Sequence, residues 1–250
     1  MSFIERRLVG LSAVCVVLLI GCGGRTDRYQ GMTPDDLFRL AQSEFSEQEY
    51  DNAIDALNRL VAAYGDWQRI QEARLLLADS YYQKEEYLTA RSEYTRFLDR
   101  YAAHQLAPSA GLGMCRSLAA LSPEPQRDQA YTQEAIGSCR NVFVDYSGTP
   151  EAQEAAEIAN GLRLVLAEKD FLNADFYFRR KLYDSAIKYY EFVVRLYPET
   201  SYAPRALLGI YLSNQAIGYA DLAEEARQQL LARYPDSEAA AEIRIDDVGS

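Results

Sequence analysis

The amino-acid sequence predicts an all-α protein: a right-handed superhelix, or α-solenoid, of five stacked helical hairpins with a C-terminal capping helix. The first observation behind this prediction is composition, because good helix formers dominate the 250 residues while Gly and Pro are sparse. The second is an apolar pattern with helical spacing that occurs five times along the chain. The third is that a helix-ending Gly or Pro follows most copies of the pattern.

The repeated pattern has steps of 3, 1, 3, 3, 1 and 3 residues, which is the spacing of one face of an α-helix. The first copy consists of Tyr50, Ala53, Ile54, Leu57, Leu60, Val61 and Tyr64. Later copies begin at Tyr87, Thr132, Tyr183 and Ala220, and all five carry Ala at the second position of the pattern. Such recurrence indicates a tandem repeat in which each copy forms the second helix of a hairpin.

Each copy follows another helical stretch, which supplies the first helix of the hairpin. The small residues Ala41, Ala78 and Cys115 recur there at intervals of 37 residues, and small side chains let the two helices of a hairpin pack closely. These features resemble the tetratricopeptide repeat family, whose repeats have about 34 residues. In this chain the spacings between the last tyrosines of the copies are 37, 45, 51 and 37 residues.

The ends of several elements can be predicted from local signals. Thr33, Pro34 and Asp36 predict the start of the first helix, because they supply a capping hydroxyl, a proline at the first helical position and an acid three residues after the cap. The polar residues 122–128 predict a long loop inside the third repeat, and residues 151–180 predict a long first helix in the fourth. Residues 238–244 predict a final helix that covers the apolar face of the last repeat.

The first 21 residues have the features of a secretory signal peptide. Arg6 and Arg7 precede an apolar run at 8–20 that is too short to span a bilayer. The run ends in Leu-Ile-Gly-Cys, which resembles the lipobox of bacterial lipoproteins. This resemblance implies cleavage before Cys22, an N-acyl diacylglycerol lipid on that cysteine and a flexible tether over residues 22–32. The alternatives are an ordinary signal peptide with a chance cysteine, or an uncleaved anchor.

Charge and the residue after Cys22 bear on where the mature chain is found. The net charge is −11 and moves to near −12 when residues 1–21 are removed, and no basic stripe is present. Such a surface repels phosphate backbones, so nucleic-acid binding is not expected. Gly23 stands where an acidic residue signals inner-membrane retention in enteric lipoproteins. By that analogy we expect the outer membrane, on its periplasmic face, with the lipid as the attachment.

The sequence predicts neither an enzyme nor a metal or cofactor site. Its one histidine, His104, is expected in a loop, and there is no CxxC spacing for zinc. The Gly111-Leu112-Gly113 segment lacks the third glycine and the preceding strand of a dinucleotide site. The abundant carboxylates fall at helix-surface spacings, so the only non-protein group we expect is the lipid on Cys22.

Cys115 and Cys139 are the cysteines that remain besides Cys15 and Cys22. They are predicted on the two helices of the third hairpin, near each other. A disulfide is one interpretation, because the periplasm permits disulfides. Two buried thiols that behave as small apolar residues are the other.

The inner wall of such a repeat stack is made by the first helices. Counting from the small residues above, three positions in each first helix face that wall in this repeat class. They are Phe38, Gln42 and Phe45 in the first repeat, Leu75, Asp79 and Tyr82 in the second, and Leu112, Arg116 and Ala119 in the third. This mixture of apolar and polar side chains favours a groove for an extended client peptide. The alternative is that Phe38, Leu75 and Leu112 only pack within the superhelix.

Three longer segments resemble the BamD (ComL) family of outer-membrane assembly lipoproteins. They are YDNAIDALNRLVAAY at 50–64, SPEPQRDQAYTQEAI at 122–136 and FYFRRKLYDSAIKYYEFVVRLYPET at 176–200. The resemblance implies a subunit of the β-barrel assembly machinery (BAM) that binds unfolded outer-membrane proteins and contacts a BamA-like β-barrel protein and other BAM lipoproteins. It implies a client groove in repeats one to three (33–148). A partner dock would lie in repeats four and five plus the cap (149–250), with Tyr177, Arg179 and Arg180 as its candidate residues.

Two other classes of lipoprotein stay open at this point. One is a glycan-binding repeat lipoprotein of the SusD type, although those chains are usually much longer and carry large irregular loops. The other is a periplasmic scaffold for cell-division or cell-wall proteins, similar to CpoB. That family tends to have an N-terminal coiled coil, whereas residues 23–50 contain no sustained heptads.

Overall fold

A computed structural model describes the backbone of residues 28–249 and the side chains as far as Arg244. The predicted signal peptide, Cys22 and the tether up to residue 27 lie outside the described residues. Within the described part, none of the helices combines the length and the apolar character that crossing a membrane requires.

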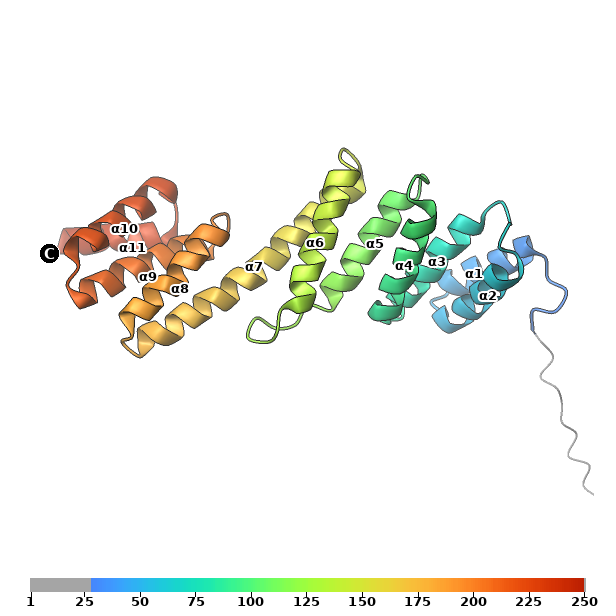
Figure 1. The fold of residues 1–250 in the computed structure, drawn as a ribbon, viewed down its shortest axis with the longest axis horizontal. Helices are drawn as coiled ribbons and strands as arrows, with labels where there is room; N and C mark the ends of the chain where they lie inside the picture. Colours follow the sequence, from blue (N-terminus) through green and yellow to red (C-terminus); the bar gives the residue numbers. More distant parts are fainter. Residues whose placement is uncertain (1–27, 250) are drawn as a thin grey trace, which may run out of the picture.

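The described chain folds into consecutive antiparallel helices that stack along one long axis (Figure 1). The helices form the five predicted hairpins and a last helix, so the predicted α-solenoid is confirmed. The hairpins are α1 (Pro34–Ser46) with α2 (Tyr50–Ala63), α3 (Ile70–Gln83) with α4 (Tyr87–Tyr101), α5 (Ala107–Ala120) with α6 (Ala130–Asp145), α7 (Pro150–Arg179) with α8 (Tyr183–Leu196), and α9 (Tyr202–Ile217) with α10 (Ala220–Arg233). The last helix, α11 (Glu238–Gly249), runs further than the predicted 238–244.

The start of α1 has the predicted cap. The Thr33 hydroxyl oxygen accepts a hydrogen bond from the Asp36 backbone N–H at 3.2 Å, and the Asp36 carboxylate accepts one from the Thr33 backbone N–H at 3.4 Å. These two bonds satisfy amides that the first turn of a helix leaves without partners.

Four of the five hairpins turn through one backbone geometry. The residue two places before the second helix has a positive φ: 65° at Gln48, 63° at Glu85, 61° at Lys181 and 83° at Gly218. After Glu85, for example, the backbone N–H of Glu86 donates to the Tyr81 carbonyl oxygen, which closes the end of α3. The third hairpin is the exception, because its turn is the longer segment 121–129.

The repeated alanines explain why the hairpins pack closely. Ala53, Ala90, Ala135 and Ala186 are completely buried, and Ala223 is 3% exposed. A second close contact joins neighbouring repeats, where Gly113 of α5 lies under the ring of Tyr94 in α4. A Cβ on Gly113 would come within 2.3 Å of that ring. Only glycine therefore fits at this crossing.

The long loop of the third repeat is organised by a buried glutamine. The Gln129 side-chain amide donates to the Glu124 carbonyl oxygen at 2.9 Å, and its carbonyl oxygen accepts from the Thr132 hydroxyl at 2.6 Å. Gln129 is 3% exposed, so these bonds are shielded from water. The predicted loop is thus an ordered feature that is fixed to the start of α6.

Helix α7 joins the two ends of the molecule, as Figure 1 shows. Its first half packs on α5 and α6 through Ala155 and Leu162, and its second half packs on α8 and α9 through Ala174. We call α1–α6 with the first half of α7 the N-terminal stack. The C-terminal stack is the second half of α7 with α8–α11.

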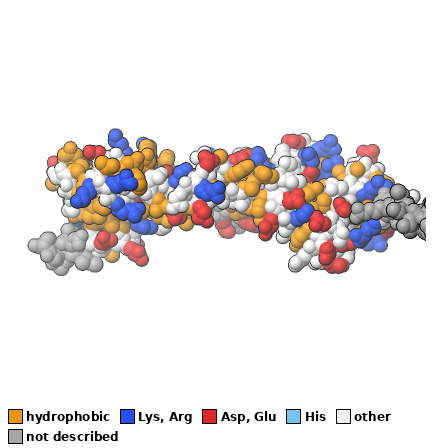
Figure 2. All heavy atoms as spheres, turned by 90° about the horizontal axis from the view of Figure 1, so that it is seen from below, with side chains coloured by type: hydrophobic (Ala, Val, Ile, Leu, Met, Phe, Trp, Pro, Cys, Tyr) orange, Lys and Arg blue, Asp and Glu red, His pale blue; other side chains and the backbone are white. Residues whose placement is uncertain are grey.

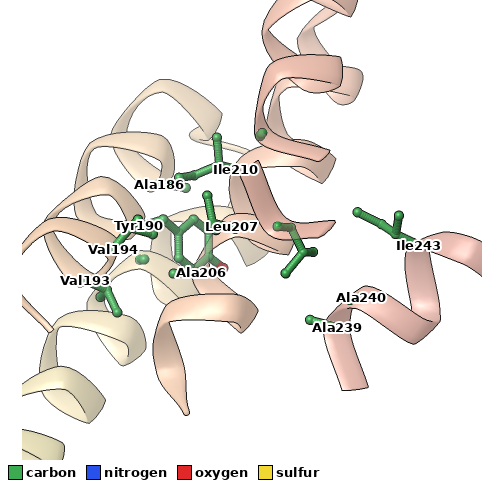
Figure 3. Close-up of a cluster of buried hydrophobic side chains, with 13 residues drawn as sticks. Ala186, Tyr190, Val193, Val194, Ala206, Leu207, Ile210, Ala239, Ala240 and Ile243 are labelled. Atoms are coloured by element: carbon green, nitrogen blue, oxygen red, sulfur yellow. The ribbon is translucent and has the colours of Figure 1, made fainter. Parts of the chain in front are cut away.

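The largest buried cluster lies in the C-terminal stack (Figure 3). Its centre is formed by side chains from α8 and α9, including Tyr190, Val193 and Leu207. Ala239, Ala240 and Ile243 of α11 belong to the same cluster and are at most 3% exposed. Helix α11 therefore covers the last repeat, as a terminal cap has to do in a solenoid.

Candidate peptide-binding wall and docking face

The first helices of the N-terminal stack carry the residues predicted for a client groove. Two of these residues are buried. Phe38 is 3% exposed and Leu112 is 5% exposed. The Phe38 ring packs edge-on against Trp67 at 5.3 Å between centroids, and the Arg69 guanidinium lies 4.6 Å from its centroid. The prediction that Phe38 and Leu112 line an open groove is therefore wrong. They hold neighbouring helices together, because the superhelix closes over these positions.

The remaining predicted residues are accessible. Gln42 and Arg116 are exposed, and Phe45, Leu75 and Tyr82 are half-buried. We call these five residues the inner wall.

Two aromatic pairs stand at the turn end of the inner wall. The rings of Phe45 and Tyr50 lie 5.5 Å apart in an edge-on arrangement, and those of Tyr82 and Tyr87 lie 5.5 Å apart in a tilted one. Each pair bridges the two helices of one hairpin, so the rings are held in place by packing. Rigid aromatic side chains that keep part of their surface in water are typical anchors for a polypeptide partner.

Asp79 lies beside the inner wall and already has a partner. The Tyr94 hydroxyl donates a hydrogen bond to the Asp79 carboxylate at 2.6 Å. Burial raises the pKa of the Asp79 carboxyl to about 6, and this bond and the charge of Arg116 only partly oppose the shift. The predicted groove residue Asp79 thus serves to hold Tyr94 over Gly113.

Arg116 is held by a two-pronged ion pair. Its Nε and Nη2 atoms donate to the two carboxylate oxygens of Glu154 in α7, at 2.8 Å and 2.7 Å. This pair fixes a flat guanidinium on the exposed surface of the wall.

A cleft of about 510 Å³ continues from the end of α5. It lies between the loop 121–129 and α7, and Ala119, Pro123, Pro125, Leu162 and Val165 are among the residues that line it. Ala119, which the sequence predicts on the same wall as Arg116, is half-buried and lines this cleft.

The second candidate surface is an aromatic face at the junction of α7 and α8. Tyr177 stacks on Tyr189 with 5.2 Å between ring centroids and 10° between ring planes. Phe176 and Phe192 flank this stack and remain 45% and 40% exposed. We call these four residues, with Arg180, the aromatic face. Figure 2 shows hydrophobic and basic side chains gathered at this C-terminal end of the molecule.

The two arginines predicted for a dock contact different kinds of side chain. The Arg180 guanidinium lies 4.2 Å from the centroid of Phe176, and Arg179 forms an ion pair with Asp175 at 2.9 Å. The structure therefore brings Tyr177 and Arg180 together on one surface, while Arg179 is paired along its own helix. Sequence reasoning missed Phe176, Tyr189 and Phe192. The signal that could have found them is aromatic residues of α7 and α8 that fall outside the repeated buried pattern.

Cys115 and Cys139 are joined by a disulfide that links α5 to α6. Their Cα atoms are 4.9 Å apart, and both residues are completely buried. Of the two interpretations that the sequence left open, the structure has the disulfide.

The described residues contain no group of three or more His, Cys, Asp or Glu side chains that could hold a metal ion. His104 has a local role, because its Nδ1 atom accepts a hydrogen bond from the Leu106 backbone N–H at 3.2 Å and its ring packs on Phe97.

Stacked hairpins with an accessible wall of first helices define this chain as a tetratricopeptide-repeat binding protein. The family model described as "YfiO: Outer membrane lipoprotein" matches residues 30–230. The chain therefore belongs to this family of outer membrane lipoproteins.

Several relatives share the same name, "Outer membrane protein assembly factor BamD". The one from Vibrio cholerae is 24% identical over 233 residues, which covers 88% of this chain and 95% of the relative. Those from Xylella fastidiosa strain 9a5c and Caulobacter vibrioides are 23% and 24% identical, covering 94% and 90% of this chain and 84% and 75% of the relatives. Among solved structures, the TPR2AB domain of yeast Sti1 aligns with a TM-score of 0.47 at 14% identity, over 83% of this chain and 80% of that one.

Proposed function

We propose that this protein is an assembly factor for outer-membrane proteins, with a client site in the N-terminal stack and a partner dock in the C-terminal stack. The shared name of its relatives supports the assembly role over the SusD-like and CpoB-like alternatives. The single observation that carries the client site is the inner wall, where aromatic rings fixed within the first two hairpins stand beside exposed polar groups. The protein itself performs no covalent chemistry in this proposal.

The client of the inner wall is an extended segment of an unfolded outer-membrane β-barrel protein. Phe45 and Tyr82 present partly exposed rings for apolar side chains, and Gln42 and Arg116 offer donors for peptide carbonyl oxygens. Alternating apolar and polar side chains are what a strand of a β-barrel provides. A wall with both kinds of group therefore suits an unfolded strand better than a folded surface.

The partner of the aromatic face is a periplasmic domain of a membrane-embedded β-barrel protein similar to BamA, with which other lipoproteins of the machinery associate. Phe176 and Phe192 leave about half of their surface in water, and Arg180 stands above one of them. Aromatic residues with arginine are enriched where protein interfaces gain most of their affinity.

The attachment to the membrane is the lipid on Cys22, which places the repeats on the periplasmic face of the outer membrane. Acyl chains contribute about 0.8 kcal/mol for each buried methylene, so two or three chains anchor a protein stably. Cys22→Ala is expected to release folded protein into the soluble fraction. Membrane fractionation that the substitution leaves unchanged would remove this part of the proposal.

The client site is tested by fluorescence anisotropy with a labelled peptide from the last strand of an outer-membrane β-barrel protein. Replacing both Phe45 and Tyr82 by Ala should weaken binding by roughly 5–150-fold, the range for loss of interface anchors worth 1–3 kcal/mol. Tyr131→Ala is the matched control, because Tyr131 is an exposed aromatic residue of α6 away from the wall. Equal affinities of all three proteins, with equal helicity, would contradict the client site.

The dock is tested by gentle detergent pull-down from native membranes. The protein should bring down a BamA-like β-barrel, and replacing Tyr189 and Phe192 by Ser should reduce its recovery by at least fivefold. The control is Tyr219→Ser, because Tyr219 is 54% exposed and precedes α10. Recovery of the barrel with the first variant at the wild-type level would move the dock elsewhere.

A further inference from the structure

A cleft of about 440 Å³ lies in the C-terminal stack, on the side of α8 that faces away from the aromatic face. Helices α8 and α10 form its two walls and α9 forms its floor. Its apolar lining includes Ile187, Val194, Leu207, Ile210, Leu222 and Ala226. Leu222 is 49% exposed at the edge of the cleft, so apolar surface there faces water in the free protein.

Asn214 gives the cleft a polar side chain that makes no hydrogen bond within the described part of the chain. This residue of α9 is 3% exposed and lines the cleft, and its side-chain amide makes no hydrogen bond with any residue between 28 and 244. A side-chain amide offers both donors and an acceptor, which matches a peptide group of another chain. An extended chain has free peptide groups, whereas those of a helix are already bonded, so Asn214 favours an extended ligand.

The charges on the cleft are ordered along its length. Glu191 and Arg195 follow each other on α8, and Glu225 and Arg233 follow each other on α10. Both helices run antiparallel to α9, so the two acids lie towards one end and the two arginines towards the other. At 1.5 Å per residue the acid and the base are separated by about 6 Å along α8 and about 12 Å along α10.

The two arginines are available to a ligand. Neither Arg195 nor Arg233 forms an ion pair with an acid among the residues that the structure describes; each instead lies over an aromatic ring, at 5.0 Å from Phe192 and 5.3 Å from Tyr234. The Tyr234 hydroxyl donates to the Pro198 carbonyl oxygen at 2.7 Å and ties the ends of both walls together at this side.

We propose that this cleft binds an extended segment of a partner polypeptide that carries a basic residue, two alternating apolar residues and an acidic residue, in that spatial order. Side chains of an extended chain alternate between two faces, so the apolar ones enter the cleft and the charged ones reach its rim. The basic side chain lies near Glu191 and Glu225, and the acidic one near Arg195 and Arg233. Asn214 bonds a peptide group of the segment. This site is separate from the inner wall, and it borders the aromatic face at one point, where Arg195 lies over Phe192.

The test uses the purified mature protein and fluorescein-labelled peptides of sequence Lys-Leu-Ser-Leu-Asp with an amidated end. Anisotropy should show binding at least fivefold tighter than for the same peptide with Asn in place of Asp. Replacing Arg195 and Arg233 together by Ala should remove this difference. Arg140→Ala, at an exposed position of α6, should preserve it.

The apolar and amide contacts have their own variants. Leu222→Asp should abolish binding of both peptides, and Asn214→Ala should weaken both by at least threefold, while Phe45→Ala with Tyr82→Ala should change neither. No binding at millimolar peptide, or a preference for Asp that survives loss of both arginines, would overturn the proposal. A dimer in sedimentation that Leu222→Asp dissociates would also overturn it, by assigning the cleft to a second copy of the chain.

Discussion

The N-terminal and C-terminal stacks contain the same three-residue arrangement in different electrostatic settings. Asp79, Tyr94 and Gly113 in the first have counterparts 96 residues later in Asp175, Tyr190 and Gly209. In both stacks a tyrosine of one repeat lies over a glycine of the next, with a Cβ position 2.3 Å from the Tyr94 ring and 2.5 Å from the Tyr190 ring.

The partners of the tyrosine and the aspartate differ between the stacks. The Tyr94 hydroxyl bonds to Asp79, whereas Asp175 forms an ion pair with Arg179 and the Tyr190 ring packs on Phe171. Close packing between repeats therefore needs only the tyrosine ring of one repeat and the glycine of the next. The acid beside them is free to hold the ring or to shape the surface, which lets the two stacks present different faces.

The largest expected difference between the stacks comes from the disulfide, which only the N-terminal stack has among the described residues. Replacing Cys115 and Cys139 by Ala removes a covalent link across 24 residues of sequence, and should lower the free energy of unfolding by about 3 kcal/mol. Urea unfolding followed by circular dichroism measures this loss. An N-terminal stack that unfolds at the same urea concentration with and without the bond would contradict the comparison.

The next largest difference between the stacks is expected in the loss of stability when each of the two glycines is replaced by alanine. Gly113→Ala is expected to cost about 2–3 kcal/mol and Gly209→Ala about 1–2 kcal/mol, because overpacking is harder to relieve where the ring is held by a hydrogen bond. The midpoints of thermal unfolding of the two variants show which substitution lowers stability more. Equal losses would show that the bond from Tyr94 to Asp79 does not restrain the ring.

The half-buried Asp79 predicts a dependence of stability on pH. Because burial raises its pKa in the folded state to about 6, the folded protein binds a proton that the unfolded chain releases between about pH 4 and 6. Relative to Asp79→Asn, the wild type should therefore be most stable below pH 4 and lose about 2–3 kcal/mol by pH 7. Chemical unfolding of both proteins at pH 4, 5.5 and 7 checks this. A difference that is constant with pH would refute it.

The smallest expected effect comes from the turns. Glu85→Gly in the N-terminal stack and Lys181→Gly in the C-terminal stack should each raise stability by about 0.5–1 kcal/mol, because glycine adopts a positive φ without a steric penalty. Gly218→Ala, at the equivalent turn, should lower it by a similar amount. Thermal unfolding of the three variants should give these signs, and a destabilised Glu85→Gly would mean that the Glu85 side chain contributes more than its backbone costs.

Much of the fold can be predicted from the sequence, because the repeat is defined by the spacing of residues that are close together along the chain. The five alanines, the cap at Thr33 and the polar loop before α6 each have a physical cause that acts within a few residues. Helix α11 continues past the predicted end at Arg244, because the following residues give no stop signal until Gly249.

The candidate site was less predictable, because exposure depends on residues far away in the sequence. Phe38 has the spacing of a wall residue, but Trp67 and Arg69 cover it from the segment before the next repeat. Tyr189 gains its exposed stack from Tyr177 on the preceding helix. The cleft with Asn214 needs three helices from two repeats, and no single stretch of sequence contains it.

The central claim is that the N-terminal stack receives clients while the C-terminal stack holds the membrane partner. Photo-crosslinking in native membranes tests it most directly, with p-benzoylphenylalanine placed at Tyr82 or at Phe192. We expect adducts with newly made outer-membrane proteins from the first position and with one membrane-embedded β-barrel from the second. Adducts with the same protein from both positions, or client adducts only from the second, would contradict it.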